Sequence, residues 1–418
     1  HDGLHLVFVE NDWAFNRDGL YLDAEGRDYP DNVGRFSLFN RAVLEYCLQS
    51  GYLPDIFHCN DWQTALLPVY LSSSYQRPQF EQARSLLTIH NFGYQGIFPA
   101  EEIYSAGLGW EWHTPELLEY HGQINLLKGG IVCANAITTV SPTYAREIQT
   151  ADFGMGLDGL ILYHNDKLVG ILNGIDTEVW DPKTDTALSA NYDPTKLRKK
   201  AVNKQALQKR LGLHVDPDAL LVSMVTRLDA HKGVGLALEA LARLKEKQIQ
   251  FALLGTGSAY LEEHALELAI KQPGRIAVVV GYDEQLAHQM YAGADALLMP
   301  SLYEPCGLSQ MYAQRYGTVP IVREVGGLKD TVTTYSDRRL ARRSASGFSF
   351  KPFKSVSLAS SIRSAYKLFN KHRERWDQLA ADIMGIDNSW RASANLYGQL
   401  YEQLLMVDET VTTAEAQG

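Results

Sequence analysis

The chain has 418 residues, more than one ordinary hydrophobic core accommodates and enough for two or three domains of about 150 residues. Hydrophobic residues make up 45% and charged residues 21%, which is typical of globular proteins and excludes a disordered chain or a small disulfide-stapled one. The formal charge is −10. We therefore expect no nucleic-acid partner, because non-specific binding to nucleic acid needs clustered positive charge.

The four cysteines show no Cys-x-x-Cys spacing and no metal-binding pattern, so we expect a reducing compartment, no disulfide framework and no metal site. No apolar run approaches the ~18 residues that would span a bilayer, so we expect no membrane partner. The chain opens at His1 with neither an initiator Met nor a signal peptide, and we expect it to begin part-way through a domain.

Short apolar runs alternate with amphipathic segments along the chain. The runs are nearly continuously apolar, as expected for parallel strands that are buried on both faces. The predicted strands are Leu6–Val9, Asp55–Cys59, Ser85–His90, Ala136–Val140, Lys167–Leu172, Leu220–Arg227, Gln250–Gly255, Arg275–Tyr282, Ala296–Pro300 and Pro320–Val325. The predicted helices are Phe39–Gln49, Leu197–Leu211, Val234–Glu246, Ala259–Ile270 and Met311–Tyr316. This alternation predicts an α/β fold with doubly wound parallel sheets.

A polar segment, Asp181–Asp193, separates the two series of strands. We expect an incomplete Rossmann-like domain over residues 1–172 and a second Rossmann-like domain over 173–388, facing each other across a cleft. Residues 389–405 carry aromatic and leucine side chains on one helical face and are predicted to form a helix that crosses back to the first domain. Residues 406–418 are polar and are expected to form a flexible tail.

Open α/β sheets bind ligands at the carboxyl ends of their strands, so polar residues that follow a predicted strand are candidates. Arg227 and Lys232 lie on one strand-to-helix loop that ends in Gly233, and both side chains can face a single anion. The alternative interpretation is two solvated surface charges. Gly255 and Gly327 follow other strands and are weak indicators alone, but beside the two cations they suit a diphosphate.

Glu304 follows the predicted strand Ala296–Pro300, and Pro305 and Gly307 after it favour a helix start and a close backbone approach. The carboxylate can bind sugar hydroxyls or stabilise positive charge at an anomeric carbon. Alternatively, it caps the following helix. Tyr282 ends another predicted strand, where its ring can stack on a base or pack as a partly buried side chain.

The first half of the chain offers polar and aromatic residues after two predicted strands. Planar hydrogen-bonding groups beside ring faces are typical of carbohydrate sites, although a single histidine is more often a structural residue. The candidates are Asp61, Trp62, His90, Asn91, Tyr94 and Gln95. Together the halves predict a nucleotide-diphosphate site and a hydroxyl-rich acceptor face, which is the division that a two-domain glycosyltransferase requires.

An ordered set of motifs extends this interpretation over nearly the whole chain, from about Tyr29 to Tyr401. The motifs are Asn60–Thr64, Thr88–Asn91, Tyr94–Gly96, Leu127–Gly130, Thr139–Glu147, Leu172–Asp176, Arg227–Lys232 and Glu304–Leu308. In this order they resemble the bacterial glycogen synthase and plant starch synthase family, which are retaining glucosyltransferases of the GT-B fold.

The resemblance implies three groups of site residues. The implied catalytic residues are His90, Arg227, Lys232 and Glu304; the donor-binding residues are Asn173, Gly255, Tyr282, Gly307, Leu308 and Gly327; and the acceptor-side residues are Asp61, Trp62, Asn91, Tyr94 and Gln95. In these roles Arg227 and Lys232 hold the diphosphate of the donor, Glu304 lies beside its glucose, and the carbonyl of His90 helps to stabilise an oxocarbenium-like state.

The implied reaction transfers α-glucose from ADP-glucose, with UDP-glucose as an alternative donor, to the non-reducing end of an α-1,4-glucan or maltooligosaccharide with retention. We expect no cofactor and no metal ion, because the two cations can stabilise the leaving group. The implied compartment is the bacterial cytoplasm or the plastid stroma.

Two positions and one loop depart from related patterns. Gln63 stands where the family has His, and Tyr312 stands where many retaining GT-B enzymes have a second Glu, which fits starch synthases better. The N-terminal Lys-x-Gly-Gly-Leu loop of the family is absent from these residues, so the chain as written is expected to be weak or inactive.

Two other functions remain open. One is another retaining GT-B transferase, such as a sucrose- or trehalose-type synthase. The other is a non-catalytic glucan-binding or regulatory protein, which the intact Arg227, Lys232 and Glu304 oppose.

Overall fold

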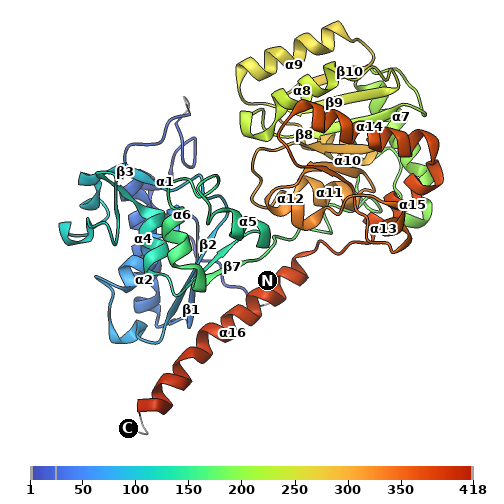
Figure 1. Cartoon of the computed structure of the whole chain (residues 1–418). Helices are drawn as coiled ribbons and strands as arrows, with labels where there is room; N and C mark the ends of the chain where they lie inside the picture. Colours follow the sequence, from blue (N-terminus) through green and yellow to red (C-terminus); the bar gives the residue numbers. More distant parts are fainter. Residues whose placement is uncertain (1–2, 24–25, 416–418) are drawn as a thin grey trace. The chain divides into compact units, whose positions relative to one another are not determined.

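The computed structural model describes residues 3–23 and 26–415 and divides into two compact units (Figure 1). The first unit contains His1–Val140, Ala145–Ile171 and the chain from Tyr397 onward, whereas the second contains Ser141–Tyr144 and Leu172–Leu396. The chain thus passes from the first unit to the second next to the boundary that we placed at residue 172. The helix that we predicted over residues 389–405 divides between the two units, because the second unit ends at Leu396 and the first resumes at Tyr397.

The first unit is built on a parallel sheet whose strand order is β1-β2-β6-β7. Its strands are β1 (Ile56–Asn60), β2 (Arg84–Ile89), β6 (Ala136–Thr139) and β7 (Leu168–Gly170). A small antiparallel sheet of β3 (Ile97–Pro99), β5 (Gln123–Asn125) and β4 (Glu119–Tyr120) was not predicted. Its helices are α1 (Asp12–Phe15), α2 (Asn32–Ser50), α3 (Leu66–Leu71), α4 (Leu126–Cys133), α5 (Pro142–Glu147, shared with the second unit) and α6 (Asp158–Tyr163).

Two predictions for the first unit are wrong in detail. The segment Leu6–Val9 is not a strand, and Leu6 and Phe8 are exposed, because an apolar run forms a strand only where a neighbouring strand bonds to it. Helix α2 begins before the predicted Phe39, at Asn32. Its first turns carry Arg35, a buried residue whose guanidinium donates to the carbonyl of Ala14 at 2.6 Å, and a buried arginine does not look like a core position in a sequence.

Helix α16 (Trp390–Glu415) completes the core of the first unit. Leu400 packs with Leu86, Ala136 and Ile171. Nearby, the hydroxyl of Tyr401 lies 2.7 Å from Nδ1 of His58 in β1. The helix does not end where we expected a flexible tail to begin, at residue 406, but continues to Glu415, because a helix that is already formed adds one backbone hydrogen bond for each further residue. The end of that tail, residues 416–418, lies outside the described residues.

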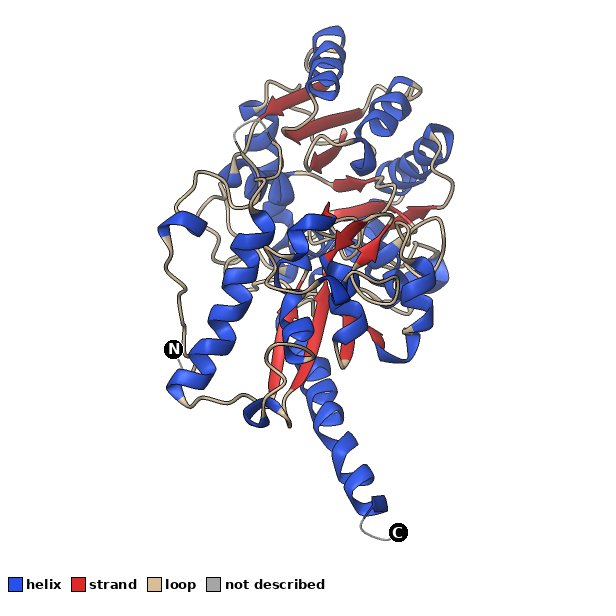
Figure 2. Cartoon of the chain, turned by 90° about the vertical axis from the view of Figure 1, so that its left-hand side faces the viewer, coloured by secondary structure: helices blue, strands red, loops and turns tan. Residues whose placement is uncertain are grey.

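The second unit contains a six-stranded parallel sheet of order β10-β9-β8-β11-β12-β13, with helices on both sides (Figures 1 and 2). The strands are β8 (Leu220–Val225), β9 (Ile249–Gly255), β10 (Ile276–Val280), β11 (Ala296–Met299), β12 (Val319–Arg323) and β13 (Phe348–Phe350). The helices are α7 (Lys200–Arg210), α8 (Val234–Ala242), α9 (Ala259–Lys271), α10 (Glu284–Gly293), α11 (Ser309–Arg315), α12 (Gly326–Thr331), α13 (Asp337–Ala341), α14 (Ser355–Lys371) and α15 (Arg373–Met384).

Alternate residues of each strand in this sheet enter different hydrophobic clusters. Val222 and Phe251 belong to a cluster with α8 and α14, whereas Leu221 and Ala252 belong to a cluster with α7 and α10. Side chains alternate between the faces of a strand, so burial of both sets explains why the strands are continuously apolar in sequence. Strand β13 was not predicted, since three residues are too few to show this pattern.

The polar segment that follows the boundary packs on the second unit through a buried aromatic and acidic cluster. The ring of Trp180 stacks on that of His288, with centroids 3.9 Å apart. Asp185 accepts a hydrogen bond from the hydroxyl of Tyr316 at 2.5 Å and lies 2.7 Å from Nδ1 of His288. Each helix within residues 3–23 and 26–415 is too short or too polar to cross a membrane.

Candidate functional site

The carboxyl ends of β8 and β11 lie next to each other, because these two parallel strands pair directly. The loop after β8 carries Lys232 and the loop after β11 carries Glu304. The Lys232 ammonium lies 2.9 Å from both carboxylate oxygens of Glu304. The Glu304 side chain is 8% exposed and that of Lys232 is 19% exposed, so the ion pair is mostly buried. The sequence separates these residues by a whole βαβ unit and more, and the sheet brings them together.

Ser301 was not predicted as a site residue, but it contacts the same carboxylate. Its hydroxyl donates to Oε2 of Glu304 at 2.9 Å, and Ser301 is buried. With Lys232, it leaves Glu304 both ionically paired and hydrogen-bonded, which fixes the direction of the carboxylate. The only sequence signal is that Ser301 follows Pro300 in the same loop.

The loops approach closely because glycines occupy three positions. Gly233 has a φ of +72°, and a Cβ there would lie 2.2 Å from the carbonyl oxygen of Pro300. Gly326 has a φ of +42°, and its Cβ would lie 1.9 Å from the Glu304 carbonyl oxygen. At Gly327 a Cβ would lie 2.0 Å from the Cys306 carbonyl oxygen. Any side chain at these positions would push the loops around Glu304 apart.

Arg227, the other predicted cation, lies on the Lys232 loop with a side chain that is 61% exposed. Its Nε is 3.5 Å from Oδ2 of Asp229, which is in turn 3.6 Å from Nε2 of His231. The His231 ring stacks on Tyr303, with centroids 5.1 Å apart. Burial lowers the pKa of His231, and the charges of Asp229, Lys232 and Arg227 act on the same ring, so these groups form one cluster.

The other predicted donor-side residues lie at the same carboxyl edge of the sheet or beside it. Tyr282 follows β10 and is 87% exposed. A Cβ on Gly255 would lie 1.8 Å from the Thr226 carbonyl oxygen, so this glycine lets β9 end against the loop of Arg227. Gly307 has a φ of +72° and Leu308 is partly exposed. The backbone of Asn173 hydrogen-bonds the thiol of Cys306, two residues from Glu304.

In the first unit, Asp61 follows β1 and His90 follows the adjacent strand β2. Asp61 has a φ of +57°, unusual for a residue other than glycine, and its Oδ1 accepts a hydrogen bond from the backbone N–H of His90 at 2.7 Å. Burial raises the pKa of the Asp61 carboxyl. The His90 ring lies 2.9 Å from Oδ1 of Asn60. The carboxylate therefore holds the backbone of the predicted catalytic residue in place.

The acceptor-side candidates divide by burial. Trp62 is buried against Phe36, with ring centroids 5.1 Å apart. Gln95 is buried and accepts a hydrogen bond from Nδ2 of Asn125 at 2.7 Å. In contrast, Tyr94 is 53% exposed.

Asn91 is partly exposed, and its side chain accepts from the N–H of Gly93. Trp62 and Gln95 therefore pack beneath the surface, where we had expected residues that contact a ligand. A sequence does not show which aromatic and amide groups the tertiary fold covers.

Comparisons with known proteins agree with this arrangement of loops on two sheets. Residues 1–163 match the starch synthase catalytic domain family, and residues 207–382 match the family of glycosyl transferases group 1. A sucrose-phosphate synthase from Thermosynechococcus elongatus is similar with a TM-score of 0.57 at 20% identity, over 92% of this chain and 80% of that one, which shows the fold alone. The chain is thus a glycosyltransferase of the GT-B fold.

Relatives of higher identity define the family more narrowly. A glycogen synthase of Geobacillus thermodenitrificans is 43% identical over 98% of this chain and 83% of its own length, and one of Aromatoleum aromaticum is 47% identical over 92% and 77%. The catalytic domain of starch synthase IV from Arabidopsis thaliana, solved with ADP and acarbose, superimposes with a TM-score of 0.84 at 39% identity, covering 90% of this chain and 78% of that one. The chain belongs to the glycogen synthase and starch synthase family.

Proposed function

We propose that this synthase transfers an α-glucosyl group from ADP-glucose to the non-reducing end of an α-1,4-glucan, with retention of configuration. The observation that carries the proposal is the buried ion pair of Lys232 and Glu304 at the carboxyl edge of the second sheet. A cation and an acid held together there suit a substrate that joins a sugar to a diphosphate, because one end needs positive charge and the other needs a hydrogen-bond acceptor.

In this proposal the cations act on the leaving group. Cleavage of the bond to the anomeric carbon places negative charge on the diphosphate, and Lys232 and the exposed Arg227 neutralise it. Lys232 gives up part of its contact with Glu304 when a phosphate oxygen takes its place. The freed carboxylate oxygen of Glu304 then accepts hydrogen bonds from the glucose hydroxyls, while Ser301 keeps the other oxygen, Oε2, in position.

The donor and acceptor are inferred from relatives and from exposed rings. The starch synthase IV structure contains ADP, and the exposed ring of Tyr282 is free of packing that would prevent it from stacking on an adenine. The same structure contains acarbose, an oligosaccharide analogue, which supports a glucan or maltooligosaccharide as acceptor. On the first unit, Tyr94 and Asn91 are the accessible candidates for that acceptor, and His90 contributes its backbone carbonyl.

We also propose that the reaction needs no metal ion, since Arg227 and Lys232 supply the positive charge. The residues that the structure describes contain no group of three or more His, Cys, Asp or Glu side chains arranged to hold a metal. An assay with a chelator tests this point directly: activity that disappears with EDTA and returns with a divalent cation contradicts it.

The test of the function measures ADP release from ADP-glucose with maltooligosaccharide as acceptor, and UDP release from UDP-glucose in parallel. We expect elongated oligosaccharide with ADP-glucose as the better donor. Glucan binding without release of either nucleotide would contradict the proposed activity.

We predict that Lys232→Ala lowers the rate by about 10²–10³-fold, because the transition state loses one preorganised charge. The matched control is Lys351→Ala, which removes a lysine from an exposed pair with Glu324 (Nζ to Oε2 3.6 Å) in the same unit. The control should keep the parental rate. Equal rates for Lys232→Ala and the parent would refute the role of Lys232.

A further inference from the structure

Helix α13 and the turn after it concentrate positive charge in a protein that is acidic overall. Arg338, Arg339, Arg342 and Arg343 lie within six consecutive positions, and Arg338 and Arg342 are one helical turn apart and so on the same face. A hollow of about 530 Å³ lies at this face, lined by Ser336, Arg338, Arg339, Arg342 and Ser344. We call it the arginine pocket.

The guanidinium groups of the arginine pocket are largely unused by the protein. Among the described residues, the guanidinium groups of Arg338 and Arg342 form no hydrogen bond or ion pair, and Arg339 donates from Nη1 to the carbonyl of Thr334 at 2.9 Å. No carboxylate lines the hollow. The nearest acid in sequence, Asp337, is already bound by Arg375 at 3.0 Å and by the hydroxyl of Tyr335. The guanidinium groups of Arg338 and Arg342, and the remaining N–H donors of Arg339, thus line a space without a countercharge.

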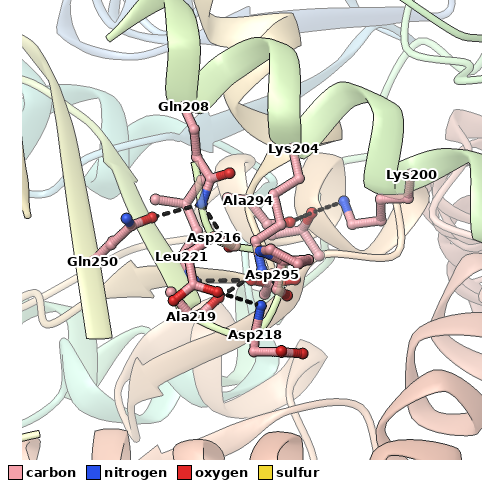
Figure 3. Close-up of polar contacts among 12 residues, drawn as sticks. Lys200, Lys204, Gln208, Asp216, Asp218, Ala219, Leu221, Gln250, Ala294 and Asp295 are labelled. Carbon is pink, nitrogen blue, oxygen red and sulfur yellow. Dashed lines mark hydrogen bonds and ion pairs between the residues drawn. The ribbon is translucent and has the colours of Figure 1, made fainter. Parts of the chain in front are cut away.

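A larger hollow in the same unit, of about 870 Å³, is lined by basic side chains that bond to groups of the protein itself. There Lys204 lies 2.8 Å from Asp295 (Figure 3). Lys200 donates to the carbonyl of Ala292 at 2.8 Å and to the hydroxyl of Thr318 at 2.6 Å. Those cations are held by protein groups and hold the fold together. In the arginine pocket, only Arg339 has such a partner among the described residues, the carbonyl of Thr334, so the charges of Arg338 and Arg342 point to a ligand.

The backbone beneath the pocket is strained in a way that glycine would relieve. Arg343 has a φ of +52° and closes α13: its N–H donates to the carbonyl of Leu340, and the N–H of Ser344 to that of Arg339, each at 2.9 Å. Glycine is the usual residue at this position of a helix end. The tight turn carries Ser344 back to the pocket wall beside Arg339. A strained conformation that assembles an unpaired charge cluster is characteristic of a binding site.

We propose that the arginine pocket binds a small molecule that carries a phosphate group. Guanidinium groups match phosphate oxygens in bidentate geometry, and the Ser336 hydroxyl adds a donor. The volume is that of a small-molecule site, and five residues of one short segment line it, so a compact anion fits better than a polymer. The pocket shares no residue with the Arg227, Lys232 and Glu304 site.

The test compares phosphate binding by the full chain and by the double variant Arg338→Ser/Arg342→Ser, using calorimetry at low ionic strength. The probes are inorganic phosphate, pyrophosphate and glycerol 3-phosphate, which separate a free anion from a phosphate ester. We expect the double variant to bind the preferred probe about tenfold or more weakly, since two charge-assisted contacts are lost. Arg227 and Lys232 remain in both proteins, so phosphate bound there contributes equally and cancels.

The matched control is Lys245→Ser/Lys247→Ser, which removes two exposed positive charges elsewhere in the second unit. This control should bind like the parent. Circular dichroism checks that both double variants are folded. Affinity that is unchanged in the arginine variant, or that falls equally in the lysine control, would overturn the proposal. So would binding confined to a long polyanion such as heparin.

Discussion

The amino and carboxyl edges of the second sheet each carry a lysine paired with an acid, but the two pairs have different roles. At the amino edge, Lys204 is 6% exposed, pairs with Asp295 at 2.8 Å, and also donates to the carbonyl of Ala219 at 2.5 Å. At the carboxyl edge, the side chain of Lys232 is 19% exposed, and its ammonium contacts the two oxygens of one carboxylate, that of Glu304. A lysine surrounded by fixed carbonyls is part of the fold, whereas one that bonds a single side chain can exchange that partner for a substrate.

Replacing Lys204 should separate the two roles most strongly. Lys204→Ala leaves Asp295 buried without its countercharge, so we expect the free energy of unfolding to fall by about 3–5 kcal/mol. Chemical denaturation of the purified variant measures this change. Any residual folded protein should retain its relative rate, in contrast to Lys232→Ala. A large stability loss in Lys232→Ala and none in Lys204→Ala would reverse our assignment of the two edges.

His58 in the first unit extends the comparison to a partly buried base whose described hydrogen-bond partners are hydroxyls and not carboxylates. It lies between the hydroxyls of Thr88 and Tyr401, at 2.6 and 2.7 Å, and burial lowers its pKa to about 4 from 6.5. The unfolded chain therefore binds a proton that the folded chain does not between these values, so stability is lost as the pH falls from 6.5 to 4.

We expect a loss on the order of 1–3 kcal/mol from this group over that interval. Denaturation at several pH values checks it, with His58→Gln as the comparison, because glutamine keeps a hydrogen bond to either neighbour but does not titrate. Parallel pH curves for the two proteins would show that His58 is not responsible.

Ser301 should affect the reaction more than the fold. In Ser301→Ala, Glu304 keeps Lys232 but loses its second anchor, and we expect a decrease in kcat of about tenfold with a smaller change in KM. Ser301→Thr, which retains the hydroxyl, should recover most of the rate. A change in KM alone, or a failure of threonine to restore the rate, would make Ser301 a packing residue only.

The smallest expected effect concerns the helix end beneath the arginine pocket. Arg343→Gly removes the cost of a left-handed backbone at a non-glycine residue, so we expect the protein to gain up to about 1 kcal/mol of stability. Arg343→Ala keeps the strain and serves as the control for loss of the exposed side chain. The prediction is wrong if both variants unfold at the same denaturant concentration.

The parts of the fold that could be predicted are those where local sequence and tertiary environment agree. Strands such as β8 and β9 are buried on both faces, so their apolar runs identified them directly. Leu6–Val9 has the same composition but no pairing partner, and β13 pairs through only three residues. Pairing depends on distant segments, and composition does not report it.

The candidate site also contains features that the sequence predicts and features that depend on tertiary contacts. The meeting of Lys232 and Glu304 followed from the rule that carboxyl ends of parallel strands share an edge. The burial of Trp62 and Gln95, and the contact of Ser301 with Glu304, depend on how loops fold over one another. No periodicity in the sequence carries that information.

Helix α16 has a consequence for how the protein is made. The core of the first unit, around Leu86, Ala136 and Ile171, is closed by Leu400 of helix α16, which follows the second unit along the chain. The ribosome synthesises the whole second unit before it adds Leu400. During synthesis the apolar residues of the first sheet that contact Leu400 therefore remain uncovered. Completion of this core depends on a segment that is translated more than two hundred residues later.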